Sequence, residues 1–289
     1  MKILVTGAAG QLGAELMRVG ETRNLAMIGT TRAELDVTDA GAVDDVVRRI
    51  APKVVINAAA WTAVDDCEGD PARANMANGT AVEHVVAAAE SVGAHIIQIS
   101  TDYVFSGTIA PGRAAAEWSE GDEPDPQSAY GRSKLLGEQA AANHTVVRTS
   151  WVCGELGSNM VKTILRVAEN TPELHFVCDQ RGKPSFTGDL SERLLDLSVS
   201  PGGVPTGILH LTNSRSVSWF EFAREVMAAA GHDPERVHPI LTADMTPPRP
   251  APRPANSSLA DTRMAAAGFA PMRDFSEPLH ELVAVLTRH

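Results

Sequence analysis

The sequence predicts an α/β protein built on a doubly wound parallel sheet, with a smaller substrate-binding lobe towards its C-terminus. Three observations predict this fold. Short apolar runs alternate with amphipathic segments through the first 150 residues, as in a parallel sheet covered on both faces. A glycine-rich turn joins the first strand to the first helix at residues 7–13. The length of 289 residues suits one large α/β domain with an appended lobe.

The elements follow in order along the chain. The apolar runs predict strands at residues 2–6, 25–29, 53–57, 94–100 and 145–150, and a later one at 207–213. The amphipathic stretches predict helices at residues 11–20, 70–93, 128–143, 159–170 and 219–231, with two closing helices at 259–268 and 275–289. A further short helix is predicted to end with residues 46–50. Asp70 is a residue type typical of a helix N-cap, and Pro71 is typical of the first helical position. Gly93 is typical of the residue that follows the end of a helix.

The domain division predicted from this pattern places a cofactor-binding domain at residues 1–150, rejoined by about 187–212. The lobe takes residues 151–186 and 213–289. Residues 246–258 are rich in Pro and Arg, and so many prolines predict an extended surface loop.

Composition excludes several classes of protein. The formal charge of −11 argues against nucleic-acid and membrane-surface binding, which both need a basic face. No apolar run is long enough for a membrane span, and the N-terminus does not resemble a signal peptide. Three scattered cysteines predict reduced thiols in the cytoplasm. The nine histidines show no metal-binding spacing, so no metal site is expected from them.

The glycine-rich turn is the first chemical signal. Gly7, Gly10 and Gly13 have the spacing G-x-x-G-x-x-G after a strand and into a helix. A diphosphate needs bare backbone and the N-terminus of a helix beside it. The turn therefore predicts a dinucleotide site, and a purely structural turn is the alternative.

The end of the second strand indicates which dinucleotide binds. NAD-specific folds usually place an acid there, but this chain has Thr30, Thr31 and Arg32, and its first acid is Glu34. Two hydroxyls and a guanidinium fit a ribose 2′-phosphate better than a 2′-hydroxyl. The tip therefore favours NADPH, with NADH as the second candidate and a solvated Arg32 as the alternative.

Polar residues follow the fourth strand in "STDYVF" and recur in "YGRSK". Tyr130 and Lys134 stand four residues apart, on one face of a helix. A nearby ammonium favours the phenolate of Tyr130, which would let it exchange a proton near neutral pH. Thr101 can hydrogen-bond a carbonyl oxygen. Together with a hydride donor, these three residues predict reduction of a ketone.

The chain resembles the dTDP-4-dehydrorhamnose reductase family of extended short-chain dehydrogenases/reductases. The matching stretches, in the order of the family, are "TGAAGQLG", "VVINAAAWTAVDDCE", "STDYVFSG", "YGRSKLLGE", "VVRTSWVCG" and "RPANSSL". The resemblance spans residues 5–259. It implies a Rossmann-type fold and an oxidoreductase that reduces the C4 ketone of dTDP-4-dehydro-β-L-rhamnose with NADPH or NADH, giving dTDP-L-rhamnose for cell-surface polysaccharide.

The resemblance also implies roles for individual residues. Thr101, Tyr130 and Lys134 match the catalytic trio, and Tyr130 and Lys134 also contact the cofactor. The other cofactor positions are Gly7, Gly10, Gln11, Leu12 and Gly13 at the diphosphate, Asp36 and Val37 at the adenine, and Ala58, Ala59 and Ala60 at a strand end. The substrate positions are Thr101, Asp102, Tyr103, Trp151 and Arg253, with Arg249 as the alternative arginine for the diphosphate.

Other interpretations stay open at this point. Some family members hold Mg²⁺ through acids near a dimer interface; Glu15 matches in position but has no clear partners, so no metal site is assigned. A homodimer is considered, although the sequence does not fix the assembly. A nucleotide-sugar epimerase or dehydratase on the same scaffold is one alternative. A non-catalytic regulatory subunit, like that of methionine adenosyltransferase, is another, and the presence of both Tyr130 and Lys134 argues against it.

Overall fold

The computed structural model describes residues 1–109, 117–200 and 202–288. Its centre is a six-stranded parallel sheet in the order β10-β5-β4-β3-β1-β2. The strands are β1 (Lys2–Thr6), β2 (Ala26–Thr30), β3 (Val54–Asn57), β4 (His95–Thr101), β5 (Thr145–Thr149) and β10 (Gly207–His210). The order reverses between β1 and β3, and a doubly wound sheet binds its ligands beyond the strand ends at such a point. The predicted fold class is confirmed.

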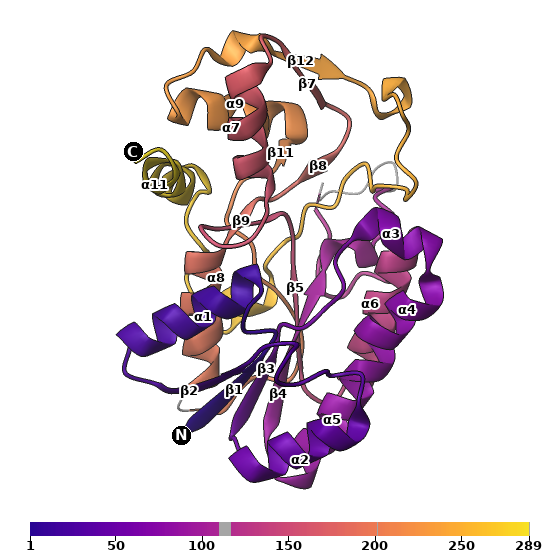
Figure 1. Ribbon diagram of the computed structural model, residues 1–289, viewed down its shortest axis with the longest axis vertical. Coiled ribbons are helices and arrows are strands. Elements are labelled where there is room, and N and C mark those ends of the chain that lie inside the picture. The colour runs from indigo at the N-terminus through magenta and orange to yellow at the C-terminus, as the bar shows by residue number, and fades with distance from the viewer. Residues whose placement is uncertain (110–116, 201, 289) are drawn as a thin grey trace.

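Helices cover both faces of the sheet, as Figure 1 shows. On one face lie α1 (Gln11–Thr22) and α8 (Thr187–Ser198), and on the other lie α2 (Ala40–Ile50), α5 (Ala81–Ser91) and α6 (Ala129–Ala140). Strand β1 shows how the sequence builds both layers. Its residues Ile3 and Val5 pack into the core with α1 and α8, whereas Leu4 packs into the core with α2 and α5, because successive side chains of a strand point to opposite faces.

The helix predicted at residues 70–93 is present but is not continuous. It consists of α4 (Pro71–Asn75), a π-helical turn η1 (Met76–Thr80) and α5. Asp70 caps it through a hydrogen bond from the Arg73 N–H. Gly93, which follows the helix, has a φ of +68°, a conformation that glycine adopts without strain. The π-turn was not predicted, and such turns often lie at functional sites.

The remainder of the chain forms a second core above the sheet in the view of Figure 1. It is made by α7 (Met160–Asn170), α9 (Trp219–Ala229), α11 (Ser276–Leu286) and the paired strands β7 (Leu174–Val177) and β12 (Val237–Ile240). The predicted helices at 159–170 and 219–231 are confirmed. The closing helix predicted at 259–268 is only the short α10 (Arg263–Ala266). The predicted domain limits remain a prediction.

Short elements connect these layers. They are α3 (Val64–Gly69), β6 (Val152–Cys153), β8 (Arg181–Gly182), β9 (Ser185–Phe186), β11 (Val217–Ser218) and the 3₁₀ turns η2 (Asp102–Val104), η3 (Pro234–Arg236) and η4 (Thr242–Asp244). Within the three described stretches, no helix has both the length and the apolar character needed to cross a membrane.

Candidate active site

The glycine-rich turn packs tightly against the end of β3. Gly7 has a φ of +69°, and a Cβ there would lie 2.8 Å from the Ala59 nitrogen. A Cβ at Gly13 would lie 2.2 Å from the Gly7 carbonyl oxygen. Both positions therefore require glycine, because a side chain would collide with backbone. The turn keeps bare backbone at the N-terminus of α1, where N–H groups lack helical partners.

A cavity of about 420 Å³ lies beside this turn, beyond the ends of β1, β2 and β3. It brings together eight of the predicted cofactor residues: Gly7, Gly10, Arg32, Asp36, Val37, Ala58, Ala59 and Ala60. Trp61, Arg73 and Met76 complete part of its wall. Arg73 stacks on the Trp61 ring with 4.3 Å between its guanidinium carbon and the ring centroid. No local pattern in the sequence indicated this pair.

Seven other predicted cofactor residues do not line the cavity, and two of these, Tyr130 and Lys134, belong to the catalytic trio. The Gln11 amide donates to the Val152 carbonyl and accepts from Asn159, so it ties the turn to β6 and the start of α7. Leu12 packs in the core, and Gly13 lies against Gly7. Thr30 is buried, and both the N–H and the hydroxyl of Thr31 donate to Glu34. Their contact with a cofactor stays a prediction.

The predicted catalytic trio converges where β4 meets α6. Thr101 ends β4, and its hydroxyl hydrogen-bonds the Tyr130 hydroxyl. The Thr101 hydroxyl also donates to the Asp102 carboxylate at 3.1 Å and accepts from the Tyr103 N–H at 3.2 Å. Lys134 donates to the Ile99 carbonyl at 2.7 Å. All three members of the trio are buried.

One expectation about Tyr130 is wrong. The spacing of Tyr130 and Lys134 predicted that the lysine favours the phenolate, but the pKa of Tyr130 is raised above its usual value. Burial is the main cause, and it outweighs the hydrogen bond with Thr101, which acts in the opposite direction. Burial also lowers the pKa of Lys134 to about 8. Tyr130 is therefore a neutral phenol that carries its proton at neutral pH.

Asp102 and Tyr103 form η2, directly after Thr101. Burial raises the pKa of Asp102 to about 7, against the opposite effect of hydrogen bonds from Ser257 and Thr101. The Tyr103 ring packs edge-on against the Tyr130 ring, with 5.7 Å between centroids. The two residues bring a carboxyl group and a phenol beside the trio, and their contact with the sugar stays a prediction.

A second cavity, of about 290 Å³, is lined by Tyr103 and by residues of the C-terminal lobe. Arg249, Arg253 and Trp219 also line it. Trp151, which the resemblance placed beside the substrate, stacks on Trp219 with 3.5 Å between ring centroids and is not part of this wall. The tryptophan that faces the cavity is thus Trp219, and nothing in the sequence indicated this role for it.

The Pro-rich segment is more than a surface loop. Arg253 donates from Nη2 to Asp65 Oδ2 on α3 at 2.8 Å and hydrogen-bonds the Tyr103 hydroxyl. Arg249 lies 3.5 Å from the same Asp65 carboxylate. Asp65 stands in the matched "WTAVDDCE" stretch, but nothing there indicated that it pairs with residues of the C-terminal loop.

Glu15, considered for Mg²⁺, is paired with Arg18, whose Nε donates to Glu15 Oε2 at 3.0 Å. Across residues 1–109, 117–200 and 202–288, no group of three or more His, Cys, Asp or Glu side chains is arranged to hold a metal ion.

Comparisons with known proteins show the family of the chain. The model of the RmlD substrate binding domain family matches residues 1–288. A dTDP-4-dehydrorhamnose reductase from Streptomyces griseus is 39% identical and covers 96% of this chain and 91% of its own. The structure of a dTDP-4-dehydrorhamnose reductase from Bacillus anthracis in complex with NADP has a TM-score of 0.91 at 32% identity, covering 98% of this chain and 99% of that one. A structure of the ortholog from Clostridium acetobutylicum has a TM-score of 0.91 at 39% identity and covers all of both chains. The chain belongs to the RmlD substrate binding domain family, the family of the dTDP-4-dehydrorhamnose reductases.

Proposed function

We propose that this protein is an NADPH-dependent oxidoreductase that reduces the C4 ketone of dTDP-4-dehydro-β-L-rhamnose to give dTDP-L-rhamnose. The observation that carries the proposal is the position of the trio. Tyr130 packs in one cluster with Trp61, which lines the cavity at the glycine turn, and with Tyr103, which lines the cavity that holds Arg249 and Arg253. The relatives described above are named dTDP-4-dehydrorhamnose reductases.

The first cavity fits a dinucleotide. The bare backbone of Gly7 and Gly10 forms one wall, where a diphosphate would accept from N–H groups, and Asp36 and Val37 stand where adenine would lie. Bound NADPH would supply the hydride. Arg32 would face the 2′-phosphate, since it is 77% exposed and its nearest charged partner, Asp36, is 3.9 Å away.

The chain's own residues supply the rest of the chemistry. Tyr130 donates its phenolic proton to the C4 oxygen as the ketone becomes an alcohol, and Thr101 donates a hydrogen bond to the same oxygen. Lys134, one helical turn after Tyr130, holds the phenol and the nicotinamide ribose in place. Asp102 and Tyr103 contact the sugar hydroxyls, Trp151 supports Trp219 beneath the sugar, and Arg253 binds the nucleotide diphosphate.

Purified protein should oxidise NADPH when dTDP-4-dehydro-β-L-rhamnose is added, as followed by the loss of NADPH absorbance. A panel of nucleotide 4-keto-sugars with other bases and hexoses tests the substrate. Turnover of a UDP-linked ketone in preference to the dTDP-linked one would overturn the assigned nucleotide. Exchange of a sugar epimer without net NADPH consumption would instead support an epimerase.

We also propose that the protein acts in the cytoplasm and as a homodimer. Light scattering of the purified protein tests the assembly.

Arg32→Gln should raise the KM for NADPH about tenfold and leave the KM for NADH nearly unchanged. The reason is that a hydrogen bond to a charged group contributes about 1.5–3 kcal/mol, and exposure of Arg32 places the effect at the lower end. The measurement is initial rate against cofactor concentration. Arg49→Gln, the same change at an exposed position of α2, serves as the control. Equal changes in both KM values would mean that Arg32 does not contact the 2′-phosphate.

A further inference from the structure

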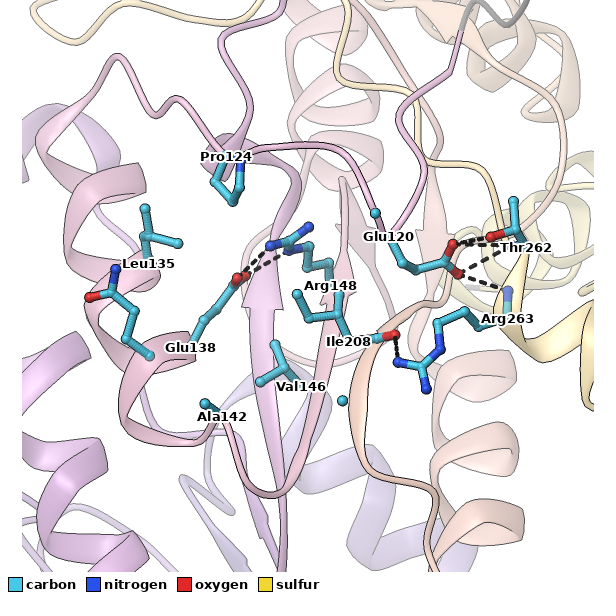
Figure 2. Close-up of a pocket in the computed structure, with 13 residues that line it drawn as sticks. Glu120, Pro124, Leu135, Glu138, Ala142, Val146, Arg148, Ile208, Thr262 and Arg263 are labelled. Atoms are coloured by element: carbon cyan, nitrogen blue, oxygen red, sulfur yellow. Dashed lines mark hydrogen bonds and ion pairs between the residues drawn. The ribbon is translucent and has the colours of Figure 1, made fainter.

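A buried ion pair lies next to the catalytic trio in the fold. Glu138, on α6 and 5% exposed, accepts from Arg148 Nε at 2.9 Å and from Arg148 Nη2 at 2.6 Å. The same carboxylate accepts from the Ser100 hydroxyl at 2.6 Å. Figure 2 shows the Glu138–Arg148 pair between α6 and β5, beside a cavity that is separate from both cavities of the active site.

The position of this pair relates it to catalysis. Ser100 precedes Thr101 on β4 and stands opposite Arg148 of β5 in the sheet register. Lys134 lies one helical turn before Glu138 and donates to the Ile99 carbonyl. Helix α6 is thus fastened to β4 at residues 99 and 100, immediately before the residue that faces the reacting carbonyl.

The electrostatics point the same way. Burial lowers the pKa of Lys134, and the charge of Glu138 is the effect that opposes it. The titratable groups on the neighbouring elements are Asp102 and Tyr103 of η2 and Cys67 of α3, and these act on Tyr130. Because residues four apart on a helix are neighbours, Glu138 is the anion best placed to keep the ammonium of Lys134 charged.

Stability alone does not explain such a pair. Replacing a buried ion pair with apolar side chains of similar size is often neutral or stabilising, because the pair loses the hydration of both ions. The Arg148 guanidinium also lies over the Phe105 ring at 5.0 Å, and its Nη1 has no hydrogen-bond partner in the described part of the chain. A group that is costly to bury and adjoins a catalytic lysine is better explained by an effect on that lysine.

We propose that Glu138, fixed by Arg148 and Ser100, is a positioning residue that keeps Lys134 protonated and holds α6 against β4 at the active site. The catalytic meaning of this role rests on the proposed function. Its effect on Lys134 does not, because the ionisation of a lysine can be measured without substrate. The two can therefore fail separately.

The decisive variant combines Glu138→Gln with Arg148→Met. Removing both charges avoids a lone buried cation, which Glu138→Gln alone would leave and which could unfold the protein. Ser100→Ala is the matched control, because it removes a hydrogen bond to the same carboxylate and leaves every charge in place. The readout is NMR titration of ¹³Cε-labelled lysine. The chain has five lysines, Lys2, Lys53, Lys134, Lys162 and Lys183, and Lys134→Arg assigns the signal.

The pKa of Lys134 should fall by about one unit in the double variant and stay unchanged in Ser100→Ala. In the assay, activity that needs the ammonium is lost as the pH rises through this pKa, so the alkaline limb of kcat should move to lower pH in the double variant alone. An unchanged Lys134 pKa in the folded double variant would overturn the proposal, as would an equal shift in Ser100→Ala. If no substrate turns over but the pKa falls, the proposed function fails and this inference stands.

Discussion

Replacing Tyr130 with Phe should lower kcat by about 10²–10⁴-fold, the range for loss of a general acid. The substitution keeps the ring, which packs edge-on against Tyr103, and removes only the hydroxyl that meets Thr101. Because burial raises the pKa of Tyr130, the phenol holds its proton throughout the neutral range. The Thr101 hydroxyl is a much weaker acid and does not replace it. Single-turnover and steady-state rates of NADPH oxidation measure the effect.

Tyr103→Phe provides the control, because it removes the neighbouring phenol, which hydrogen-bonds Arg253 rather than Thr101. We expect that change to raise the substrate KM more than it lowers kcat. The affinity for NADPH, measured by fluorescence titration, should be nearly the same in Tyr130→Phe and the parent. A Tyr130→Phe variant with the parent's turnover would show that another group donates the proton.

Replacing Arg253 with Ala should weaken dTDP binding by about 1.5–3 kcal/mol, or about 10- to 150-fold. Arg253 is the better placed of the two candidate arginines: its side chain is 15% exposed and is fixed by Asp65 and Tyr103, whereas that of Arg249 is 52% exposed. A guanidinium already held in place loses less conformational entropy when it binds a phosphate. Calorimetric titration of dTDP in the presence of NADP⁺ measures the change.

Arg249→Ala, which removes the same charge from the same cavity, should have the smaller effect. Thermal unfolding of both variants separates binding from folding, since Arg253→Ala also breaks the ion pair with Asp65. If Arg249→Ala loses affinity for dTDP and Arg253→Ala does not, the diphosphate is bound by Arg249. If neither variant changes affinity, the segment has no part in nucleotide binding.

The sheet was predictable because its signals are local. The five strands predicted before residue 150 match observed strands to within a residue, since apolar runs bounded by turns identify buried strands. The Asp70 cap and the glycine turn were equally local. Eight of the predicted cofactor residues meet at one cavity because parallel strands end at the same edge of a sheet.

The remaining features depend on pairs that are distant in sequence. Arg253 and Asp65 are 188 positions apart, and no local pattern links them. The stacking of Trp151 on Trp219 depends in the same way on the folded lobe. The pKa of Tyr130 was misjudged because the spacing to Lys134 is visible in the sequence, whereas the burial that dominates is a property of the whole site.

The edge strand β10 has a consequence for synthesis on the ribosome. Strand β10 pairs with β5, although part of the C-terminal lobe lies between the two strands in the sequence. Helix α8, which also follows residue 150, packs on α1. Met264 and Met272 reach the same core as Ile3. A nascent chain of 150 residues would therefore expose apolar surface that only later segments cover. We expect folding to be completed mainly after translation, and a gene split after codon 150 to yield fragments that need each other to become soluble.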